Sequence, residues 1–166
     1  MSKRLRIRLA VVNSAILAIL CSVPLLHAES ERPQVLFVCE HGNVKSLMAA
    51  SYFNQLAQAS GLKIQAVSRG SAPDSDAVPA PIVERLRRDG INVSGFHPLA
   101  VTAADVSTSQ HVVTIGTVLP SSIAAKSSAS EQWNDVPAAS TDFSAARASL
   151  KAHVAELFEQ LSRAAK

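Results

Sequence analysis

Short runs of apolar residues predict the strands of this chain. Residues 35–38, Val-Leu-Phe-Val, are continuously apolar, as expected of a strand that is buried on both faces. Similar runs at 64–67 and 111–115 predict a second and a third strand, and the segment 131–133 predicts a short fourth. We therefore expect a sheet of four strands.

Between these runs, apolar residues recur at the spacing of amphipathic helices. The predicted helices run from near 46 to 60, from 81 to 89, and from 143 to 161. Gly61 is the expected stop of the first helix. For the last helix, Ser140 or Thr141 is the expected cap, and Asp142 is expected to be a charge in its first turn.

Strands that alternate with helices imply an α/β protein with a parallel sheet that helices cover. The 138 residues after residue 28 suffice for one domain with a sizeable core. In such a sheet, ligands bind at the carboxyl ends of the strands, near a switch in strand order. Because Cys39 directly follows the first predicted strand, we expect it to lie at such a site.

The first 28 residues have the pattern of a secretory signal peptide. Four basic residues lie within the first eight, residues 9–26 are mostly apolar, and Ala28 offers a small residue for cleavage. Polar residues and a proline interrupt the apolar stretch, so we expect no stable membrane span after cleavage. The expected organisation is a signal peptide at 1–28 and one periplasmic or secreted domain at 29–166, with an uncleaved membrane anchor as the alternative.

Removal of this segment changes the charge and the cysteine content. The sequence has 16 basic and 13 acidic residues, and four of the basic ones lie in 1–28. The remaining 12 basic and 13 acidic residues give a net charge of −1, so no nucleic-acid partner is expected. Of the two cysteines, Cys21 leaves with the signal peptide and Cys39 cannot form a disulfide within the domain. Cys39 is then either a small buried apolar residue or a reactive thiol.

The loop after the first strand has the composition of an anion-binding site. Its sequence is Cys39-Glu40-His41-Gly42-Asn43-Val44-Lys45-Ser46. A loop that leads into a helix points several backbone N–H groups at one spot, and the helix dipole adds partial positive charge. Gly42 permits the backbone twist that such a loop needs, and Ser46 can donate its hydroxyl to the sulfur or cap the helix. The loop therefore favours a bound oxyanion or a nucleophilic thiolate.

This stretch also resembles a known family. The low-molecular-weight protein tyrosine phosphatases and the related arsenate reductases share a signature at this place. It consists of Cys-x5-Arg-Ser/Thr after a buried strand, followed by a helix that opens with Leu/Pro-Met-Ala. The chain matches it at Cys39, Ser46, Met48 and Ala49, and the similarity continues over residues 34–162. The resemblance implies a four-stranded parallel sheet with helices on both faces, in flavodoxin-like doubly wound order. It implies no metal and no organic cofactor.

The resemblance assigns roles to individual residues. Cys39 is the nucleophile. The implied oxyanion-binding residues are Glu40, His41, Gly42, Asn43, Val44, Lys45 and Ser46. The family arginine, whose planar fork grips two oxygens, is Lys45 here, which brings a charge but only a point contact. The family acid belongs to an Asp-Pro pair, and Asp135, one residue displaced from its proline, is either its counterpart or a solvated turn residue.

Three assignments remain open from the sequence. Arg69 ends the second strand, and it either reaches the oxyanion crevice and replaces the lost fork or lies on the surface. Glu40 disfavours dianions unless it points away or pairs with His41 or Lys45. His41 could ligate a metal together with Cys39 and Glu40, but no second Cys/His cluster completes a site, so no metal is predicted.

Three functions fit these observations. The first is phosphomonoester hydrolysis of the protein tyrosine phosphatase type, through a phospho-cysteine at Cys39, with Lys45 holding charge and Asp135 acting as acid and then base. The second is arsenate reduction with an external thiol or a partner reductant, because the domain has no second cysteine. The third is a non-catalytic oxyanion-binding module. Phosphate, arsenate or a phosphomonoester is the expected ligand in each case.

Overall fold

The computed structural model describes residues 34–124 and 130–164, so the predicted signal peptide lies outside the described residues. The strands are β1 (Gln34–Cys39), β2 (Gln65–Gly70), β3 (Ser109–Ile115) and β4 (Glu131–Trp133). The helices are α1 (Lys45–Ser60), α2 (Ala80–Arg88), α3 (Ala103–Thr108), α4 (Ser121–Ala124) and α5 (Phe143–Ala164). The four predicted strands and three predicted helices are confirmed, and α3 and α4 are additional. No described helix has both the length and the apolar character needed to cross a membrane.

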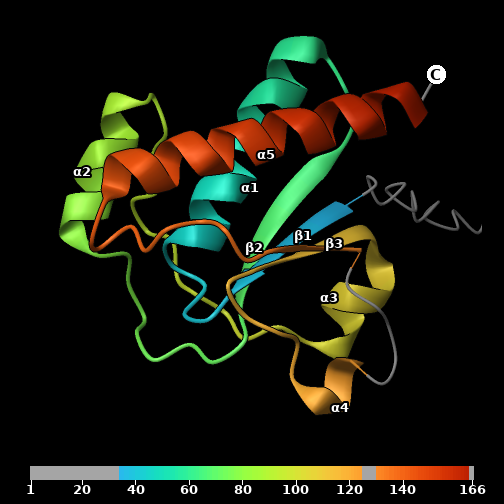
Figure 1. The fold of residues 1–166 in the computed structure, drawn as a ribbon, viewed down its shortest axis with the longest axis horizontal. Coiled ribbons are helices and arrows are strands. Elements are labelled where there is room, and N and C mark those ends of the chain that lie inside the picture. Colours follow the sequence, from blue (N-terminus) through green and yellow to red (C-terminus); the bar gives the residue numbers. More distant parts are fainter. Residues whose placement is uncertain (1–33, 125–129, 165–166) are drawn as a thin grey trace, which may run out of the picture.

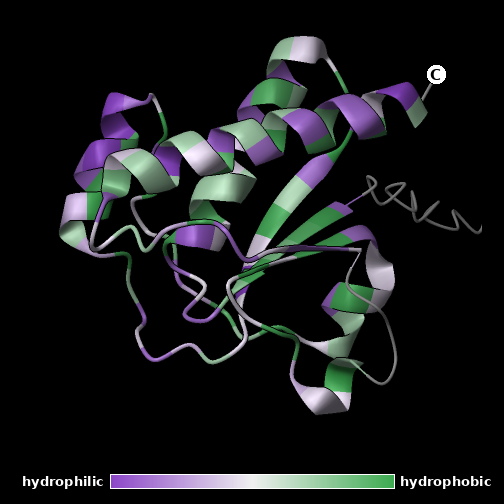
Figure 2. Cartoon of the chain, in the orientation of Figure 1, coloured by the Kyte–Doolittle hydropathy of each residue, from purple (hydrophilic) through white to green (hydrophobic). Residues whose placement is uncertain are grey.

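The strands form one parallel sheet in the order β2-β1-β3-β4. This confirms the predicted four-stranded sheet and its doubly wound order. Helices α1, α2 and α5 lie on one side of the sheet, and α3 and α4 lie on the other (Figure 1). Figure 2 shows why the apolar runs predicted strands, since the hydrophobic residues concentrate in the sheet while α2 is largely hydrophilic.

Strand β1 lies at the centre of the fold because both of its faces are buried. Val35 and Phe37 pack with residues of α1 and α5 on one face. Leu36 and Val38 pack on the other face with residues from α3 and α4. All four side chains are fully buried. Side chains of a strand alternate between its faces, so a strand covered on both sides must be apolar at every position.

The helix ends follow local capping rules, with one correction to the expected cap. Gly61 ends α1 in the left-handed conformation, as predicted. At the start of α5, the carboxylate of Asp142 accepts a hydrogen bond from the backbone N–H of Ala145 at 2.9 Å. Asp142 is therefore the cap, in place of Ser140 or Thr141, because the helix begins two residues later than a cap at Ser140 requires and one later than a cap at Thr141 requires.

Two glycines allow the loop after β1 to pack against the end of β2. Gly42 has a φ of 75°, and a Cβ built on it would lie 2.6 Å from the backbone nitrogen of Gly70. A Cβ on Gly70 would lie 2.9 Å from the carbonyl carbon of His41. The chain order switches here, since β2 and β3 flank β1 on opposite sides. The loop therefore lies at the switch point where α/β sheets bind ligands.

Candidate active site

The sulfur of Cys39 accepts one backbone hydrogen bond and makes a second hydrogen bond with a serine hydroxyl, in which either group can donate. The thiol is 4% exposed at the end of β1. The backbone N–H of Gly42 donates to Sγ at 3.3 Å, and the hydroxyl of Ser46 lies 3.0 Å from it. Donors aimed at one sulfur stabilise negative charge on it. Cys39 is therefore both a buried residue at the end of β1 and a thiol with polar groups directed at its sulfur.

Ser68, which the sequence analysis missed, supports this arrangement from β2. Its hydroxyl lies 2.8 Å from that of Ser46 and 3.0 Å from the carbonyl oxygen of Gly42. Ser68 has one hydroxyl proton, which it donates either to the carbonyl oxygen of Gly42 or to Ser46; in the second arrangement the proton of Ser46 is left to point at the sulfur of Cys39. The signal in the sequence is a polar residue at an inward-facing position near the carboxyl end of a predicted strand.

The backbone of the loop is fixed by contacts that leave N–H groups for an anion. Asn43 is buried, and its side-chain amide donates to the carbonyl oxygen of Ala77 at 3.1 Å. Val44 occupies the cap position of α1, and the structure gives it no side-chain cap and no acidic residue in the first turn. The first-turn N–H groups of a helix need a partner, and an anion held by the loop can supply it.

Lys45 brings a positive charge to the same place. Its side chain is partly buried and extends toward the end of β3, where a Cβ built on Gly116 would lie 2.7 Å from Nζ. Gly116 thus provides the space in which the ammonium group lies. Within residues 34–124 and 130–164, no carboxylate lies within ion-pair distance of Lys45. Its charge is therefore available to a bound oxyanion.

A cavity of about 400 Å³ opens over Cys39. It is bounded by the cysteine loop, the ends of β1 and β3, and a segment that precedes α5. The residues that line it include Cys39, Glu40, His41, Asn43, Lys45, Asp74, Gly116, Ala139 and Ser140. This volume accommodates a small phosphomonoester.

His41 forms the mouth of this cavity together with two carboxylates. Its Nδ1 lies 3.0 Å from Oδ1 of Asp74, and its Nε2 lies 3.8 Å from Oε2 of Glu40. Glu40 is thus nearer to His41 than to Lys45, which corresponds to the predicted alternative in which Glu40 pairs with His41. Asp74 was not predicted, because it lies 33 positions along the chain in an irregular loop. No group of three or more potential metal ligands is found among the described side chains.

The structure does not bring Asp135 to the cavity. Its carboxylate bonds with Nε2 of His153 on α5 at 2.9 and 3.0 Å, and its side chain is 67% exposed. The hydrogen bond from His153 lowers the pKa of Asp135. His153 in turn stacks on Trp133 with ring centroids 4.8 Å apart. Asp135 is thus held ionised by His153 and is not among the residues that line the cavity. This geometry corresponds to the solvated turn residue, the second of the two alternatives for Asp135.

Arg69 does not reach the oxyanion loop either, which corrects the idea that it replaces the missing fork. Its guanidinium pairs with Asp105 of α3 at 2.9 Å and donates to the carbonyl oxygen of Ser68 at 2.9 Å. Neighbouring strand residues point to opposite faces, so the position that turns Ser68 toward Ser46 turns Arg69 toward α3. Among the lysine and arginine side chains of the described residues, Lys45 is the one that lines the cavity.

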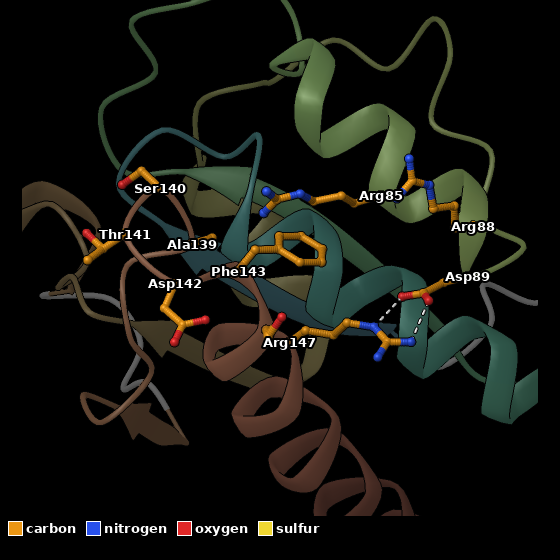
Figure 3. Close-up of a pocket in the computed structure, with 10 residues that line it drawn as sticks. Arg85, Arg88, Asp89, Ala139, Ser140, Thr141, Asp142, Phe143 and Arg147 are labelled. Atoms are coloured by element: carbon orange, nitrogen blue, oxygen red, sulfur yellow. Dashed lines mark hydrogen bonds and ion pairs between the residues drawn. The ribbon is translucent and has the colours of Figure 1, made fainter.

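A second pocket, of about 540 Å³, lies between α2 and the start of α5 (Figure 3). Two residues that line it, Arg147 and Asp89, form a two-point ion pair, and the hydroxyl of Tyr52 donates to the same carboxylate at 2.7 Å. The hydrogen bond from Arg147 is the main cause that lowers the pKa of Asp89. Burial, followed by the hydrogen bond to Asp89, raises the pKa of Tyr52. The cluster joins α1, the end of α2 and α5.

This second pocket is connected to the first by the chain itself. Ala139 and Ser140 border both cavities. Arg85 stacks over the ring of Phe143 at 4.6 Å, at the first residue of α5. Because the segment that borders the cysteine cavity leads directly into α5, the ion pair of Arg147 with Asp89 helps to fix that border.

Comparison with known proteins agrees with the geometry. The family model described as low molecular weight phosphotyrosine protein phosphatase matches residues 34–166. YfkJ from Bacillus subtilis has a similar structure, with a TM-score of 0.69 and 22% identity over 83% of this chain and 99% of that one. A thioredoxin-dependent arsenate reductase from Corynebacterium glutamicum gives 0.65 and 22% over 82% of this chain and 65% of that one.

A third similar structure is the low molecular weight protein tyrosine phosphatase from T. tengcongensis, with a TM-score of 0.63 and 20% identity over 79% of this chain and 98% of that one. No curated protein sequence matches the chain. At these identities, the structural similarities establish the fold.

Proposed function

Because the chain belongs to the low molecular weight phosphotyrosine protein phosphatase family, we propose that it hydrolyses phosphomonoesters through a phospho-cysteine at Cys39. The observation that supports this most strongly is the placement of the sulfur. Sγ of Cys39 receives the N–H of Gly42 and faces the hydroxyl of Ser46 at the base of a cavity at the start of α1. This is the arrangement that an attack on a tetrahedral oxyanion requires.

The reaction proceeds in two steps at this sulfur. In the first, the thiolate of Cys39 attacks phosphorus, an S–P bond forms, and the ester P–O bond breaks as its oxygen takes a proton. In the second, water gives up a proton and attacks phosphorus, and the S–P bond breaks to release phosphate and the thiolate. The loop N–H groups and Lys45 stabilise the charge on the phosphoryl oxygens in both steps. Ser46 stabilises the departing thiolate of the second step.

The presence of Lys45 makes this a weaker clamp than an arginine fork. An ammonium group contacts one oxygen as a point charge, whereas a guanidinium can donate to two oxygens at once. One charged hydrogen bond contributes about 1.5–3 kcal/mol, or about ten- to a hundredfold in rate. We therefore propose a slow phosphatase with an otherwise complete oxyanion cradle.

Arsenate reduction is the second candidate, because the same cradle fits a tetrahedral arsenate. Arsenate reductases occur among the proteins of similar structure. Cys39 is the one cysteine of the chain outside residues 1–28. The two electrons for reduction would then come from two external thiols, which are oxidised to a disulfide as arsenate becomes arsenite.

Two parallel assays test these proposals. Residues 29–166 and the Cys39→Ser variant are incubated with p-nitrophenyl phosphate, and separately with arsenate and excess glutathione. Release of p-nitrophenol that is lost in the variant supports the phosphatase, and thiol-dependent formation of arsenite supports the reductase. Binding of phosphate without either reaction would leave the non-catalytic module as the function.

We also propose that the domain acts outside the cytoplasm, on the evidence of its first 28 residues. Expression of the full chain in a bacterium, followed by fractionation and N-terminal sequencing, should find a periplasmic protein that begins at or near Glu29. Full-length protein confined to the cytoplasm would contradict this proposal.

A further inference from the structure

The proposed reaction needs a group that gives a proton to the leaving oxygen, and the cavity itself indicates which one. Asp135, which the sequence suggests for this role, forms a hydrogen bond with His153 and is not among the residues that border the cavity. His41 and Asp74 both border it. They approach each other from the cysteine loop and from a loop beyond β2, with Nδ1 and Oδ1 3.0 Å apart.

We propose that His41 is the general acid and base of this site and that Asp74 is the residue that positions it. This inference rests on the proposed phosphatase activity. It assigns the proton transfer to the cysteine loop itself, two residues after the nucleophile, and not to the segment that follows β4.

The contact with Asp74 determines which ring nitrogen can transfer the proton. An ionised carboxylate repels the lone pair of an unprotonated nitrogen, so the ion-pair contact with Asp74 favours the tautomer that carries a proton on Nδ1 of His41. Nε2 is then the nitrogen that gains and loses a proton during the reaction. It lies 3.8 Å from Oε2 of Glu40, beyond hydrogen-bond distance, so that contact does not occupy it.

The other charged groups of the cavity are less suited to this task. Lys45 extends toward Gly116 at the end of β3, where it supports the oxyanion. The carboxylate of Asp74 is engaged by Nδ1 of His41. Glu40 and Asp74 are exposed to a similar degree, at 66% and 68%, and His41, at 46%, is the least exposed of the three.

The proton balance of the two steps follows. When the S–P bond to Cys39 forms, Nε2–H of the protonated His41 gives its proton to the ester oxygen, which leaves as an alcohol or phenol. The neutral ring then takes a proton from the water that attacks the phospho-cysteine. Phosphate leaves, and both the thiolate and the protonated ring are restored.

The dependence of the rate on the leaving group tests this assignment. p-Nitrophenol is a good leaving group that needs little help from an acid, whereas phenol, with a pKa of about 10, needs a proton. His41→Asn keeps an N–H at the position of Nδ1 and removes Nε2. We expect it to lower kcat for phenyl phosphate by about a hundredfold or more, with a much smaller loss for p-nitrophenyl phosphate.

Matched variants separate this role from a structural one. Asp74→Asn should also slow phenyl phosphate more than p-nitrophenyl phosphate, but by a smaller factor than His41→Asn does. Asp135→Asn should leave the ratio of the two rates unchanged. The affinity for inorganic phosphate should stay within a few fold in all three, which shows that the loop remains folded.

Each other outcome overturns the assignment. Equal losses on the two substrates would make His41 a structural residue. A larger selective loss in Asp74→Asn than in His41→Asn would make Asp74 the acid, and a selective loss in Asp135→Asn would return that role to Asp135. If the wild-type domain turns over neither substrate, the proposed function fails and this inference fails with it. If it turns over both and no variant changes their ratio, only this inference fails.

Discussion

Replacement of Lys45 tests how the cavity holds an oxyanion. The side chain is partly buried, extends toward Gly116, and has no carboxylate within ion-pair distance among the described residues. Lys45→Ala removes the positive charge and leaves the loop N–H groups in place. Lys45→Arg keeps the charge and adds the planar fork that can contact two oxygens.

The magnitude follows from the number of charged contacts. Loss of one charged hydrogen bond costs about 1.5–3 kcal/mol, so Lys45→Ala should weaken phosphate binding by about ten- to a hundredfold. Lys45→Arg recovers a second contact and should strengthen binding or raise turnover by about tenfold. The space that Gly116 provides beside Nζ is where the larger guanidinium has to fit.

Titration calorimetry with inorganic phosphate gives the affinity, and p-nitrophenyl phosphate gives the turnover. Lys63→Ala is the matched control, because Lys63 is exposed and precedes β2, at the opposite end of the sheet from the cysteine loop. It removes the same charge from the protein without touching the cavity. An affinity for Lys45→Ala that equals that of Lys63→Ala would refute the reasoning, since Lys45 would then contribute only through net charge.

Two further substitutions test the loop and the second pocket. Gly42→Ala should abolish turnover and lower thermal stability, because φ is 75° and the new Cβ would lie 2.6 Å from the backbone nitrogen of Gly70. Gly95→Ala is the control, since Gly95 has a φ of 79° and open space around it. This control shows the effect of backbone strain without a steric clash. Asp89→Asn should lower the free energy of unfolding in urea by about 1.5–3 kcal/mol at neutral pH, through the loss of the ion pair with Arg147. The pKa of Asp89 is lowered in the folded protein, so its ionised carboxylate stabilises the fold above the ordinary value of 3.8, and this stabilisation is lost as the pH falls below that value. Below pH 3.8 the wild type should therefore lose more stability than Asp89→Asn does.

The elements that the sequence predicted are those with a long or unambiguous pattern. The run at 35–38 could be read because β1 is buried on both faces, and Gly61 could be read because the end of α1 needs a left-handed residue. Helices α3 and α4 have six and four residues, too few for a helical period to show. For α3, the capping box of Thr102 and Asp105 is a local signal that could have revealed it.

The site was predicted only where its residues are neighbours in the sequence. The cysteine loop is one continuous segment, so the sequence alone groups its residues and predicts an anion-binding site there. Ser68 and Asp74 reach it from other segments, where Ser68 contacts Ser46 and Gly42 and Asp74 contacts His41, and no local sequence pattern shows which residues they meet. The sequence left Arg69 open between the oxyanion crevice and the surface, although strand alternation alone could have assigned it to the opposite face from Ser68.

The most direct test of the central claim is detection of the covalent intermediate on Cys39. The domain is mixed with phenyl phosphate that carries a radiolabelled phosphoryl group, denatured within the first turnover, and digested for peptide mapping. We predict a label on the peptide that contains Cys39, which is lost in Cys39→Ala together with all turnover. Turnover without a labelled cysteine, or turnover that survives in Cys39→Ala, would contradict the account.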